Sequence, residues 1–311
     1  MKAVQISRHG GPETLETVDV PAPEPAAGQV LVDVAAVGVN YRDVYEREGV
    51  YGGDLPAIIG AEGAGTVSGS GERVAWVAAP GSYAEQVVVD TDRAVPVPDG
   101  VDDELAAAAL LQGITAQYLS TSTHEVEAGE NVLIHAAAGG VGLLLTQIVA
   151  MRGGRVIATT STDEKAELAR HAGAADVIRY DGFAEQVKEL TGGVGADVVY
   201  DGVGAATFDE SLASLRRRGD LVLYGAASGK VPPFDPMRLE AGGSLYVTRP
   251  GIRHYTATRE ELLTRADDVF KWIADRRLEV RIGGRYPLED ARRAHEDLEG
   301  RRTTGKLLLI P

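Results

Sequence analysis

Short apolar runs alternate with amphipathic segments through the middle of the chain. An apolar strand that begins at Asn131 leads into a turn of small residues, and an apolar helix follows over 141–150. The hydrophobic pattern then predicts, in chain order, strands or helices at 155–160 (strand), 177–178 (strand), 183–190 (helix), 196–201 (strand), 208–217 (helix) and 220–225 (strand). Strands that alternate with helices in this way are typical of an α/β fold with a doubly wound parallel sheet.

The first hundred residues follow a different pattern. Short β-rich runs such as 29–35 and 83–89 are interrupted by glycines and by proline clusters at 21–25 and 96–98. Such a composition predicts an irregular, mostly antiparallel barrel.

Past residue 250 the pattern predicts an amphipathic helix at 260–277, a second helix at 288–298 and a closing strand at 306–310. The chain shows no internal repeat and no low-complexity linker. We therefore expect residues 114–249 to form a dinucleotide-binding domain inserted into a second domain, which consists of residues 1–113 and 250–311. A ligand cleft is expected between two such domains.

Composition and charge exclude several classes of function. The 311 residues are 44% hydrophobic and contain no run of the ~18 apolar residues that a membrane span needs. The first residues are typical of a strand rather than a signal peptide, so we expect a cytoplasmic protein that does not bind membranes. The absence of cysteine excludes disulfides, thiol catalysis and cysteine-ligated zinc. A net charge of -15 disfavours nucleic acid, and the short basic run 216–218 does not offset it.

The turn after the strand at Asn131 carries the strongest chemical signal. Small residues there let the backbone turn tightly, approach a pyrophosphate and pack helix against strand, while N–H groups at the helix start face the anion. Alanine replaces the first glycine of the usual pattern, and an ordinary tight turn is the alternative interpretation. The predicted pyrophosphate-binding residues are Ala136, Gly139, Gly140, Val141 and Gly142.

The end of the next strand predicts which nicotinamide cofactor binds. An NAD enzyme normally has a carboxylate there, ~20 residues after the glycine turn. Here Thr160 and Ser161 occupy the strand end, the first acid is Asp163, and Lys165 lies one helical turn further on. Hydroxyl and ammonium groups suit a 2′-phosphate, so NADPH is favoured over NADH. For Lys165 the alternative is a solvated surface charge. At the last strand of the sheet, Tyr224 and Gly225 are expected to line the nicotinamide, with a plain turn as the alternative.

Several motifs spread over the whole length resemble one known family. They are Gly38–Tyr45, Gly60–Gly65, the stretch Gly129–Gln147, Gly243–Pro250 and the ending Thr304–Pro311. Together they are similar to the zinc-independent quinone oxidoreductases of the medium-chain dehydrogenase/reductase superfamily, which include ζ-crystallin. The chain departs from the family at Ala150, where a basic residue or serine is usual, and in the segment 68–82, which is shorter than in bacterial relatives.

The resemblance implies a Rossmann sheet inserted into a GroES-like, mostly antiparallel β-barrel domain, and it assigns further site residues. It implies that Tyr180 stacks near the adenosine and that Arg301 reaches the cofactor phosphate, although a solvated surface charge is again the alternative for Arg301. It places Asn40, Tyr45 and Tyr51 in the substrate pocket. It also implies a homodimer, with the apolar edge strand 244–248 as the contact.

The same comparison bears on zinc. In zinc-dependent members of the superfamily a cysteine stands near the position of Asn40, and a histidine precedes the glutamate of the next motif. This chain has Asn40, and Ala61 precedes Glu62. None of its six histidines forms a short ligand pair on one helix face. We therefore expect no metal site.

The leading functional hypothesis is NADPH-dependent reduction of quinones by direct hydride transfer. Asn40 would offer amide groups near the substrate, and Tyr45 and Tyr51 an apolar face and a phenol for a developing oxyanion, although ordinary half-buried tyrosines are the alternative. Reduction of an enone or enoyl thioester fits the same residues. A nucleotide-binding structural or RNA-binding protein is a hypothesis of another class, which the acidic charge disfavours.

Overall fold

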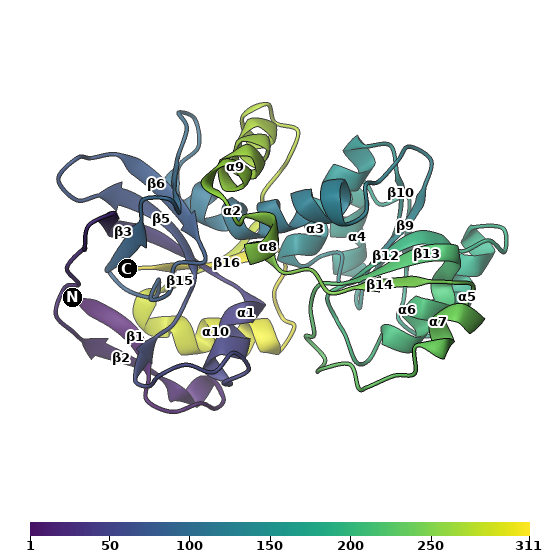
Figure 1. Ribbon diagram of the computed structural model, residues 1–311, viewed down its shortest axis with the longest axis horizontal. Helices are drawn as coiled ribbons and strands as arrows, with labels where there is room; N and C mark the ends of the chain where they lie inside the picture. Colours follow the sequence, from purple (N-terminus) through teal and green to yellow (C-terminus); the bar gives the residue numbers. More distant parts are fainter. The chain divides into compact units, whose positions relative to one another are not determined.

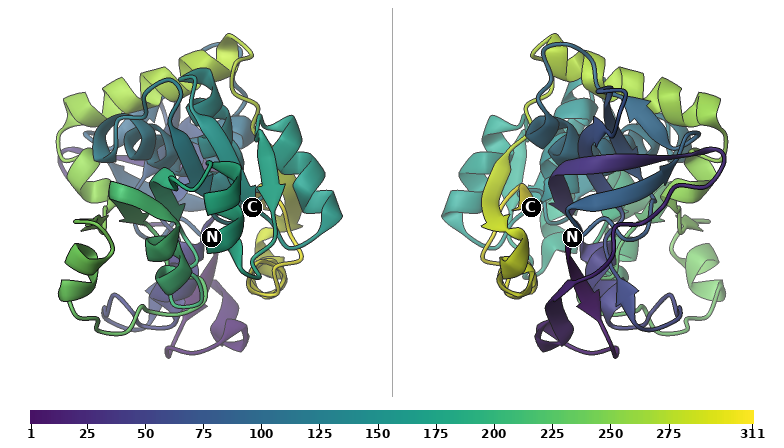
Figure 2. Two further views of the ribbon diagram at one scale, coloured as in Figure 1. Left: turned by 90° about the vertical axis from the view of Figure 1, so that its right-hand side faces the viewer. Right: turned by 90° about the vertical axis from the view of Figure 1, so that its left-hand side faces the viewer.

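The computed structural model describes residues 1–311, which divide into two compact units. The first unit consists of Met1–Ile114 and Thr256–Pro311, and the second of Thr115–Tyr255. Both chain ends lie in the first unit (Figure 2). No helix has both the length and the apolar composition that crossing a bilayer requires.

The second unit is built on a six-stranded sheet in which neighbouring strands are parallel. In spatial order the strands are β11 (Asp176–Ile178), β10 (Arg155–Thr159), β9 (Asn131–Ile134), β12 (Ala196–Asp201), β13 (Leu215–Leu223) and β14 (Tyr246–Thr248). Val132, Leu133 and Ile134 of β9 are fully buried, as in a parallel strand that is covered on both faces. The predicted doubly wound parallel sheet is confirmed.

Helices cover both faces of this sheet (Figure 1). The crossover connections place α3 and α4 on one face and α5 and α6 on the other. The helices of the unit after α2 are η2 (Leu119–Thr123), α3 (Gly140–Met151), α4 (Asp163–His171), α5 (Phe183–Leu190), α6 (Phe208–Ser214), α7 (Met237–Ala241) and α8 (Ile252–Tyr255).

The predicted helix at 208–217 is wrong at its end. α6 stops at Ser214, and Leu215 already belongs to β13, where it pairs with Ala196 of β12. Arg216 strengthens this pairing through an ion pair with Asp197. Strand pairing and burial of Leu215 therefore override the helical pattern of this segment.

The first unit contains two sheets. A three-stranded sheet has the order β2 (Leu15–Asp19), β1 (Lys2–Ile6), β4 (Ala57–Ile58). A seven-stranded sheet runs through β15 (Ile282–Pro287), β16 (Lys306–Ile310), β3 (Gln29–Val39), β5 (Glu62–Val67), β6 (Arg73–Val77) and β8 (Ala94–Pro96), with β7 (Gln86–Asp90) also paired to β3. All of its pairs except β15–β16 are antiparallel. The pairings form an open path, so a closed barrel remains a prediction.

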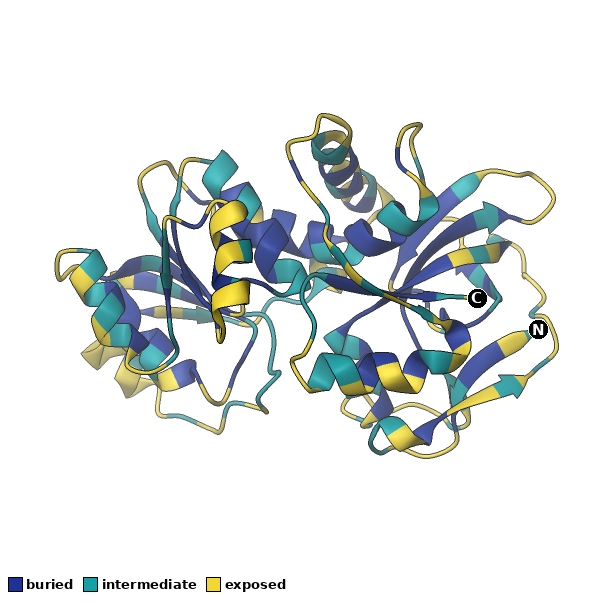
Figure 3. Cartoon of the chain, turned by 180° about the vertical axis from the view of Figure 1, so that it is seen from behind, coloured by how far each residue is buried: buried dark blue, intermediate teal, exposed yellow.

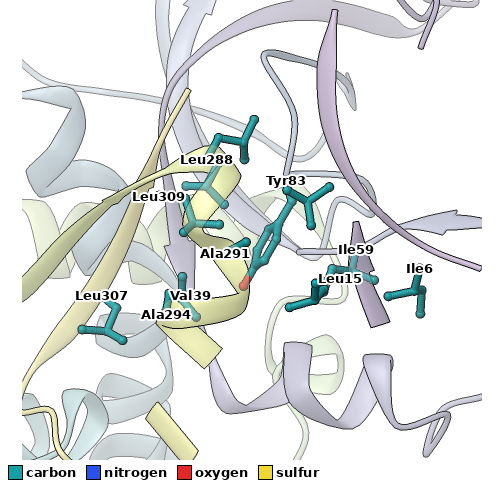
Figure 4. Close-up of a cluster of buried hydrophobic side chains, with 12 residues drawn as sticks. Ile6, Leu15, Val39, Ile59, Tyr83, Leu288, Ala291, Ala294, Leu307 and Leu309 are labelled. Carbon is teal, nitrogen blue, oxygen red and sulfur yellow. The ribbon is translucent and has the colours of Figure 1, made fainter. Parts of the chain in front are cut away.

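Helices and two clusters of buried hydrophobic side chains complete the first unit. Its helices are η1 (Pro12–Thr14), α1 (Tyr41–Arg47), α2 (Asp103–Tyr118, which runs into the second unit's residues), α9 (Arg259–Ala274), η3 (Leu288–Asp290) and α10 (Ala291–Glu299). Figure 3 shows that buried residues concentrate in the strands, whereas exposed residues lie on outer helix faces and loops. In one core cluster the ring of Tyr83 lies between Leu309 and Ala291 on one side and Ile59 on the other (Figure 4).

Candidate functional site

The small-residue turn joins β9 to α3 with the geometry that a dinucleotide turn needs. Ala136 has a φ of 50°, and Gly139 caps α3 without a side-chain hydrogen bond. A Cβ atom on Gly142 would lie 2.7 Å from Cα of Ala137, so only glycine allows this approach of helix to turn. The N–H groups of the first turn of α3 have no side-chain cap, and an anion can take their hydrogen bonds. Gly140 and Val141 belong to that turn.

A network of buried, hydrogen-bonded side chains lies next to this turn. His135 lies 2.9 Å from the Thr159 hydroxyl through Nδ1 and 2.9 Å from the Ser211 hydroxyl through Nε2. Ser211 in turn donates to the carboxylate of Asp201 at 2.9 Å. Burial lowers the pKa of His135, so the ring is neutral and serves as one donor and one acceptor. All these side chains are buried, and their hydrogen bonds join the ends of β9, β10 and β12 to α6.

Tyr180 connects the turn to the neighbouring strand ends. Its phenol accepts a hydrogen bond from the backbone N–H of Ala136 at 3.0 Å. Its ring stacks on His135, with centroids 6.0 Å apart and an interplanar angle of 21°. The structure therefore brings Tyr180 against the predicted pyrophosphate turn.

The end of β10 carries the residues expected to read the 2′ position. Thr160 is buried, Ser161 is exposed, and Lys165 lies in the first turn of α4, where its N–H binds the Thr162 hydroxyl at 3.2 Å. Sequence reasoning missed Arg179, whose Nη1 donates to the Thr160 hydroxyl at 3.2 Å and to its carbonyl at 3.3 Å.

At the end of β13, Tyr224 and Gly225 pack against the end of β12. Both backbone N–H groups donate to the carbonyl of Asp201, at 2.9 and 3.3 Å. A Cβ atom on Gly225 would lie 2.8 Å from Cα of Gly202. This close approach requires glycine at position 225, and a Cβ atom on Gly202 would lie 2.8 Å from Cζ of the Tyr224 ring.

In the first unit, Asn40 is buried and its amide is fully hydrogen-bonded. Nδ2 donates to the Gly38 carbonyl at 3.1 Å and to Glu62 at 2.8 Å. Oδ1 accepts from Lys306 at 2.7 Å and from Gln112 at 3.3 Å. Lys306 also forms a buried ion pair with Glu62. An amide has two donor and two acceptor positions, and all four are used within this unit.

Asn40 also begins α1, the short helix that carries Tyr45. The N–H of Asn40 donates to the Asp43 carboxylate at 2.8 Å, and the N–H of Asp43 donates to the backbone carbonyl of Asn40 at 2.9 Å. The tyrosines form an aromatic group: Tyr45 contacts Tyr41 and Tyr51 edge to face, with centroid distances of 5.3 and 6.2 Å. The guanidinium of Arg42 lies 5.7 Å from the Tyr51 ring centroid, which favours a cation–π contact.

A buried hydrogen-bonded chain fixes α1 against α10. Tyr83 donates to Asp43 at 3.2 Å, and His295 Nε2 lies 3.0 Å from the Tyr83 hydroxyl. Arg47 donates to Nδ1 of His295 at 3.0 Å and binds Glu299 at 2.6 and 3.1 Å. Burial, together with the charge of Arg47, lowers the pKa of His295 to about 3, and burial raises the pKa of Asp43 to about 7. A neutral His295 completes the chain from Arg47 to Asp43.

Arg301 follows α10 in the first unit. It is exposed, its φ is 55°, and its N–H donates to the Leu298 carbonyl at 3.1 Å. Across residues 1–311 no group of three or more histidine, aspartate or glutamate side chains is arranged to hold a metal ion.

Comparison with known proteins identifies the class. Residues 26–99 match the family model for the alcohol dehydrogenase GroES-like domain, and residues 140–263 match the model for the zinc-binding dehydrogenase. A GroES-like domain joined to a Rossmann sheet is the combination of the medium-chain dehydrogenases/reductases.

Individual relatives narrow the class to a family. A quinone oxidoreductase from Pseudomonas aeruginosa is 43% identical over 323 residues, which cover 100% of this chain and 99% of the relative. A 2-haloacrylate reductase from a Burkholderia species is 38% identical, with 99% of this chain and 98% of the relative covered. A mycobacterial protein solved in complex with NADPH is 51% identical, covers 100% of both chains and has a TM-score of 0.97. The chain belongs to the quinone oxidoreductase family, and the resemblance found in the sequence is confirmed.

Proposed function

We propose that the protein catalyses the NADPH-dependent reduction of quinones by direct hydride transfer, without zinc. The observation that carries this proposal is the β9–α3 turn, in which an uncapped helix start meets a backbone approach that only glycine allows. The mycobacterial relative bound to NADPH and the quinone oxidoreductase from P. aeruginosa support both the cofactor and the acceptor.

Residues of both units are proposed to hold NADPH. Ala136, Gly139, Gly140, Val141 and Gly142 would hold the pyrophosphate by backbone N–H groups. The further cofactor residues of the second unit are Tyr180 for the adenosine, Thr160, Ser161 and Lys165 for the 2′-phosphate, and Tyr224 and Gly225 for the nicotinamide. Arg301 is proposed as a phosphate ligand from the first unit. A bound reduced nicotinamide supplies the hydride, and the protein supplies position.

On the acceptor side, Tyr45 and Tyr51 would present ring faces and hydroxyls to the quinone. Asn40 uses all its amide groups inside the first unit, so we propose that it acts by placement: it begins α1 and thereby positions Tyr45. Lys306 and Glu62, which sequence reasoning did not select, hold Asn40 in turn.

Reduction of a conjugated carbonyl compound is the second candidate. The 38% identity to a 2-haloacrylate reductase over nearly the whole chain favours it. A quinone, an enone and an enoyl thioester each accept hydride on carbon and place negative charge on a conjugated oxygen.

A parallel substrate screen separates these candidates. NADPH oxidation is measured with a naphthoquinone, a short enone and crotonyl thioester, with NADH as the cofactor control and with EDTA throughout. We expect the quinone to be reduced fastest, with NADPH, and at full rate after chelation. Faster enone or thioester turnover would favour the second candidate, and activity that returns only with added zinc would contradict the proposal.

Three further expectations are proposals of the same kind. The seven-stranded sheet belongs to a β-barrel, the protein works as a homodimer, and its compartment is the cytoplasm. The two units are proposed to act as the acceptor-binding and the cofactor-binding domain, as the sequence boundaries at 113/114 and 249/250 predict.

A further inference from the structure

Arg179 bridges two elements at one edge of the parallel sheet. Its Nη1 donates to the hydroxyl and the carbonyl of Thr160, at 3.2 and 3.3 Å, and its Nη2 forms an ion pair with Asp163, the first residue of α4. Thr160 is 2% exposed, so one side of the guanidinium is fixed to a buried strand end. The Arg179 side chain itself is 43% exposed.

Residues at this position of a dinucleotide-binding fold contact the adenosine ribose of the cofactor. β10 and β11 pair in parallel, with Thr159 opposite Ile178, so Thr160 and Arg179 leave the same carboxyl edge side by side. The adenosine ribose lies at the end of the second strand of such a fold, which here is β10. The residue after Arg179 is Tyr180, whose phenol accepts the N–H of Ala136 in the glycine turn.

Charge at this edge decides between the two nicotinamide cofactors. A free carboxylate near the ribose favours its hydroxyls and repels a 2′-phosphate. Asp163 is the first acidic residue after Thr159, and its carboxylate is paired with Arg179. The Asp163 side chain is 100% exposed, and an ion pair this exposed to solvent is weak. A phosphate offers the guanidinium a bidentate partner with more charge, so exchange of partner is favourable.

We propose, on the basis of the cofactor proposed above, that Arg179 selects the 2′-phosphorylated nucleotide. Without nucleotide, its guanidinium neutralises Asp163. With the phosphorylated nucleotide, it keeps its bonds to Thr160 and exchanges the Asp163 carboxylate for the 2′-phosphate. Arg179 and Asp163 are thus specificity residues in addition to Lys165.

Calorimetric titration of the full chain with 2′,5′-ADP and with 5′-AMP tests this without turnover. Arg179→Gln should weaken the binding of 2′,5′-ADP about tenfold or more, because a charge-assisted hydrogen bond is lost. It should change the affinity for 5′-AMP less than about twofold. Asp163→Asn should strengthen the binding of 2′,5′-ADP. The affinity of Arg179→Lys for 2′,5′-ADP should lie between those of Arg179→Gln and the unchanged protein, because an ammonium group cannot form the two parallel hydrogen bonds of a guanidinium. Arg170→Gln, which removes another exposed ion pair of α4, is the matched control and should change neither ligand.

An equal loss of affinity for both nucleotides in Arg179→Gln, or no loss for either, would overturn the role of Arg179 and leave it a purely structural link between β10 and α4. Weaker binding of 5′-AMP by Asp163→Asn would overturn it too, because Asp163 would then bind the ribose hydroxyls. Thermal unfolding of each variant shows whether it is folded. If the unchanged protein binds both ligands equally, the proposed cofactor fails together with Arg179. If it discriminates as expected but reduces no quinone, the proposed acceptor alone fails.

Discussion

Ala136 occupies a backbone conformation that favours glycine. Its φ of 50° brings Cβ close to the following carbonyl oxygen, which costs an L-residue roughly 1–2 kcal/mol. The usual dinucleotide pattern has glycine at this position. The chain therefore keeps the shape of the turn while it accepts strain at one residue.

Ala136→Gly should raise the free energy of unfolding, by up to about 1 kcal/mol, because relief of the strain exceeds the roughly 0.4–1 kcal/mol that glycine adds to the entropy of the unfolded chain. Urea unfolding measures the change. Ala137→Gly is the control: Ala137 is buried and has no such φ, so glycine there should destabilise the protein. A loss of stability in both variants would show that residue 136 is not strained.

Tyr45 and Tyr51 differ in exposure, and this difference separates their expected roles. Tyr51 is 57% exposed and lies under the Arg42 guanidinium, whereas Tyr45 lies half-buried between two rings. Tyr51→Phe should lower kcat about tenfold, less than the ~10²-fold of a donor in a dry site. Tyr45→Phe should be tolerated, and Tyr45→Ala should raise KM with little change in kcat.

These roles are checked by steady-state kinetics of quinone reduction with the Phe and Ala variants at both positions. NADPH affinity is measured in parallel. NADPH affinity should survive, since the glycine turn belongs to the other unit. Unchanged quinone kinetics in all four variants would show that the acceptor site has been placed wrongly.

The sequence could point to candidate site residues but not to the residues that hold them in place. Glycine, threonine and tyrosine at motif positions could be selected as candidates from residue type alone, and their roles stay predictions. Arg179 and Lys306 could not be selected in this way, because the interest of each depends on a hydrogen-bond partner elsewhere in the sequence. Arg179 contacts Thr160, and Lys306 contacts Asn40, which is 266 residues away. Such pairs follow from tertiary packing alone.

At the scale of elements, strongly patterned segments were predictable. The helix at 183–190 and the strand at 196–201 have the predicted bounds, because burial and local pattern agree there. α2 was missed altogether: its alanines 106–109 are all fully buried and leave no polar face to reveal a helical period. β13 begins earlier than predicted because β12 pairs with it.

His124 joins three elements of the second unit. It follows η2, and its ring lies 2.8 Å from Asp220 of β13 and 3.1 Å from Glu130, the residue before β9. Burial opposes the charged ring, but hydrogen bonds from the ring to Asp220 and Glu130 outweigh burial and raise the pKa of His124. Both ring nitrogens face carboxylates, so both carry a proton in the favoured state.

Because the pKa of His124 is higher in the folded than in the unfolded protein, its stabilisation is complete below the ordinary value of 6.5 and is lost as pH rises through the raised value. His124→Gln should therefore destabilise the protein at pH 6, by about 1–3 kcal/mol for hydrogen bonds to charged groups, and by less at pH 9.

Urea unfolding of both proteins from about pH 6 to about pH 9 measures this difference. Comparison with the unchanged protein cancels the titration of the buried His135 and His295. A difference in stability that is constant over this range would contradict a charged His124.

At the scale of the whole molecule, the division into two units places the predicted functions on separate bodies. The nucleotide turn lies in Thr115–Tyr255, while the tyrosines and Asn40 lie in the unit formed by both chain ends. The antiparallel pairing of β16 with β3 joins the C-terminal segment of the chain to the N-terminal part of that unit, with Leu308 opposite Gly38. From the change in pattern at its two junctions, the sequence led us to expect a domain at 114–249 inserted into a second domain, and these boundaries stay a prediction. The course of the first unit's sheet could not be expected, because it depends on pairings between distant segments.

The edge of the parallel sheet gives the prediction for assembly. β14 pairs with β13 on one side alone, and Tyr246 at its start is 60% exposed. An exposed apolar edge strand invites pairing with a second copy, and a two-fold axis would bury both edges at once. We therefore expect a homodimer, and we expect Tyr246→Asp to shift it to monomer because the substitution buries a charge at the contact.

Light scattering at micromolar concentration measures the assembly. Val194→Asp is the matched control, since Val194 is a similarly exposed apolar residue of the same unit, 58% exposed, in a loop outside the edge strand. It should leave the dimer intact. A monomeric unchanged protein would refute the homodimer. A dimer that survives Tyr246→Asp but dissociates in Val194→Asp would move the contact away from β14, because the charge would then act where the subunits meet.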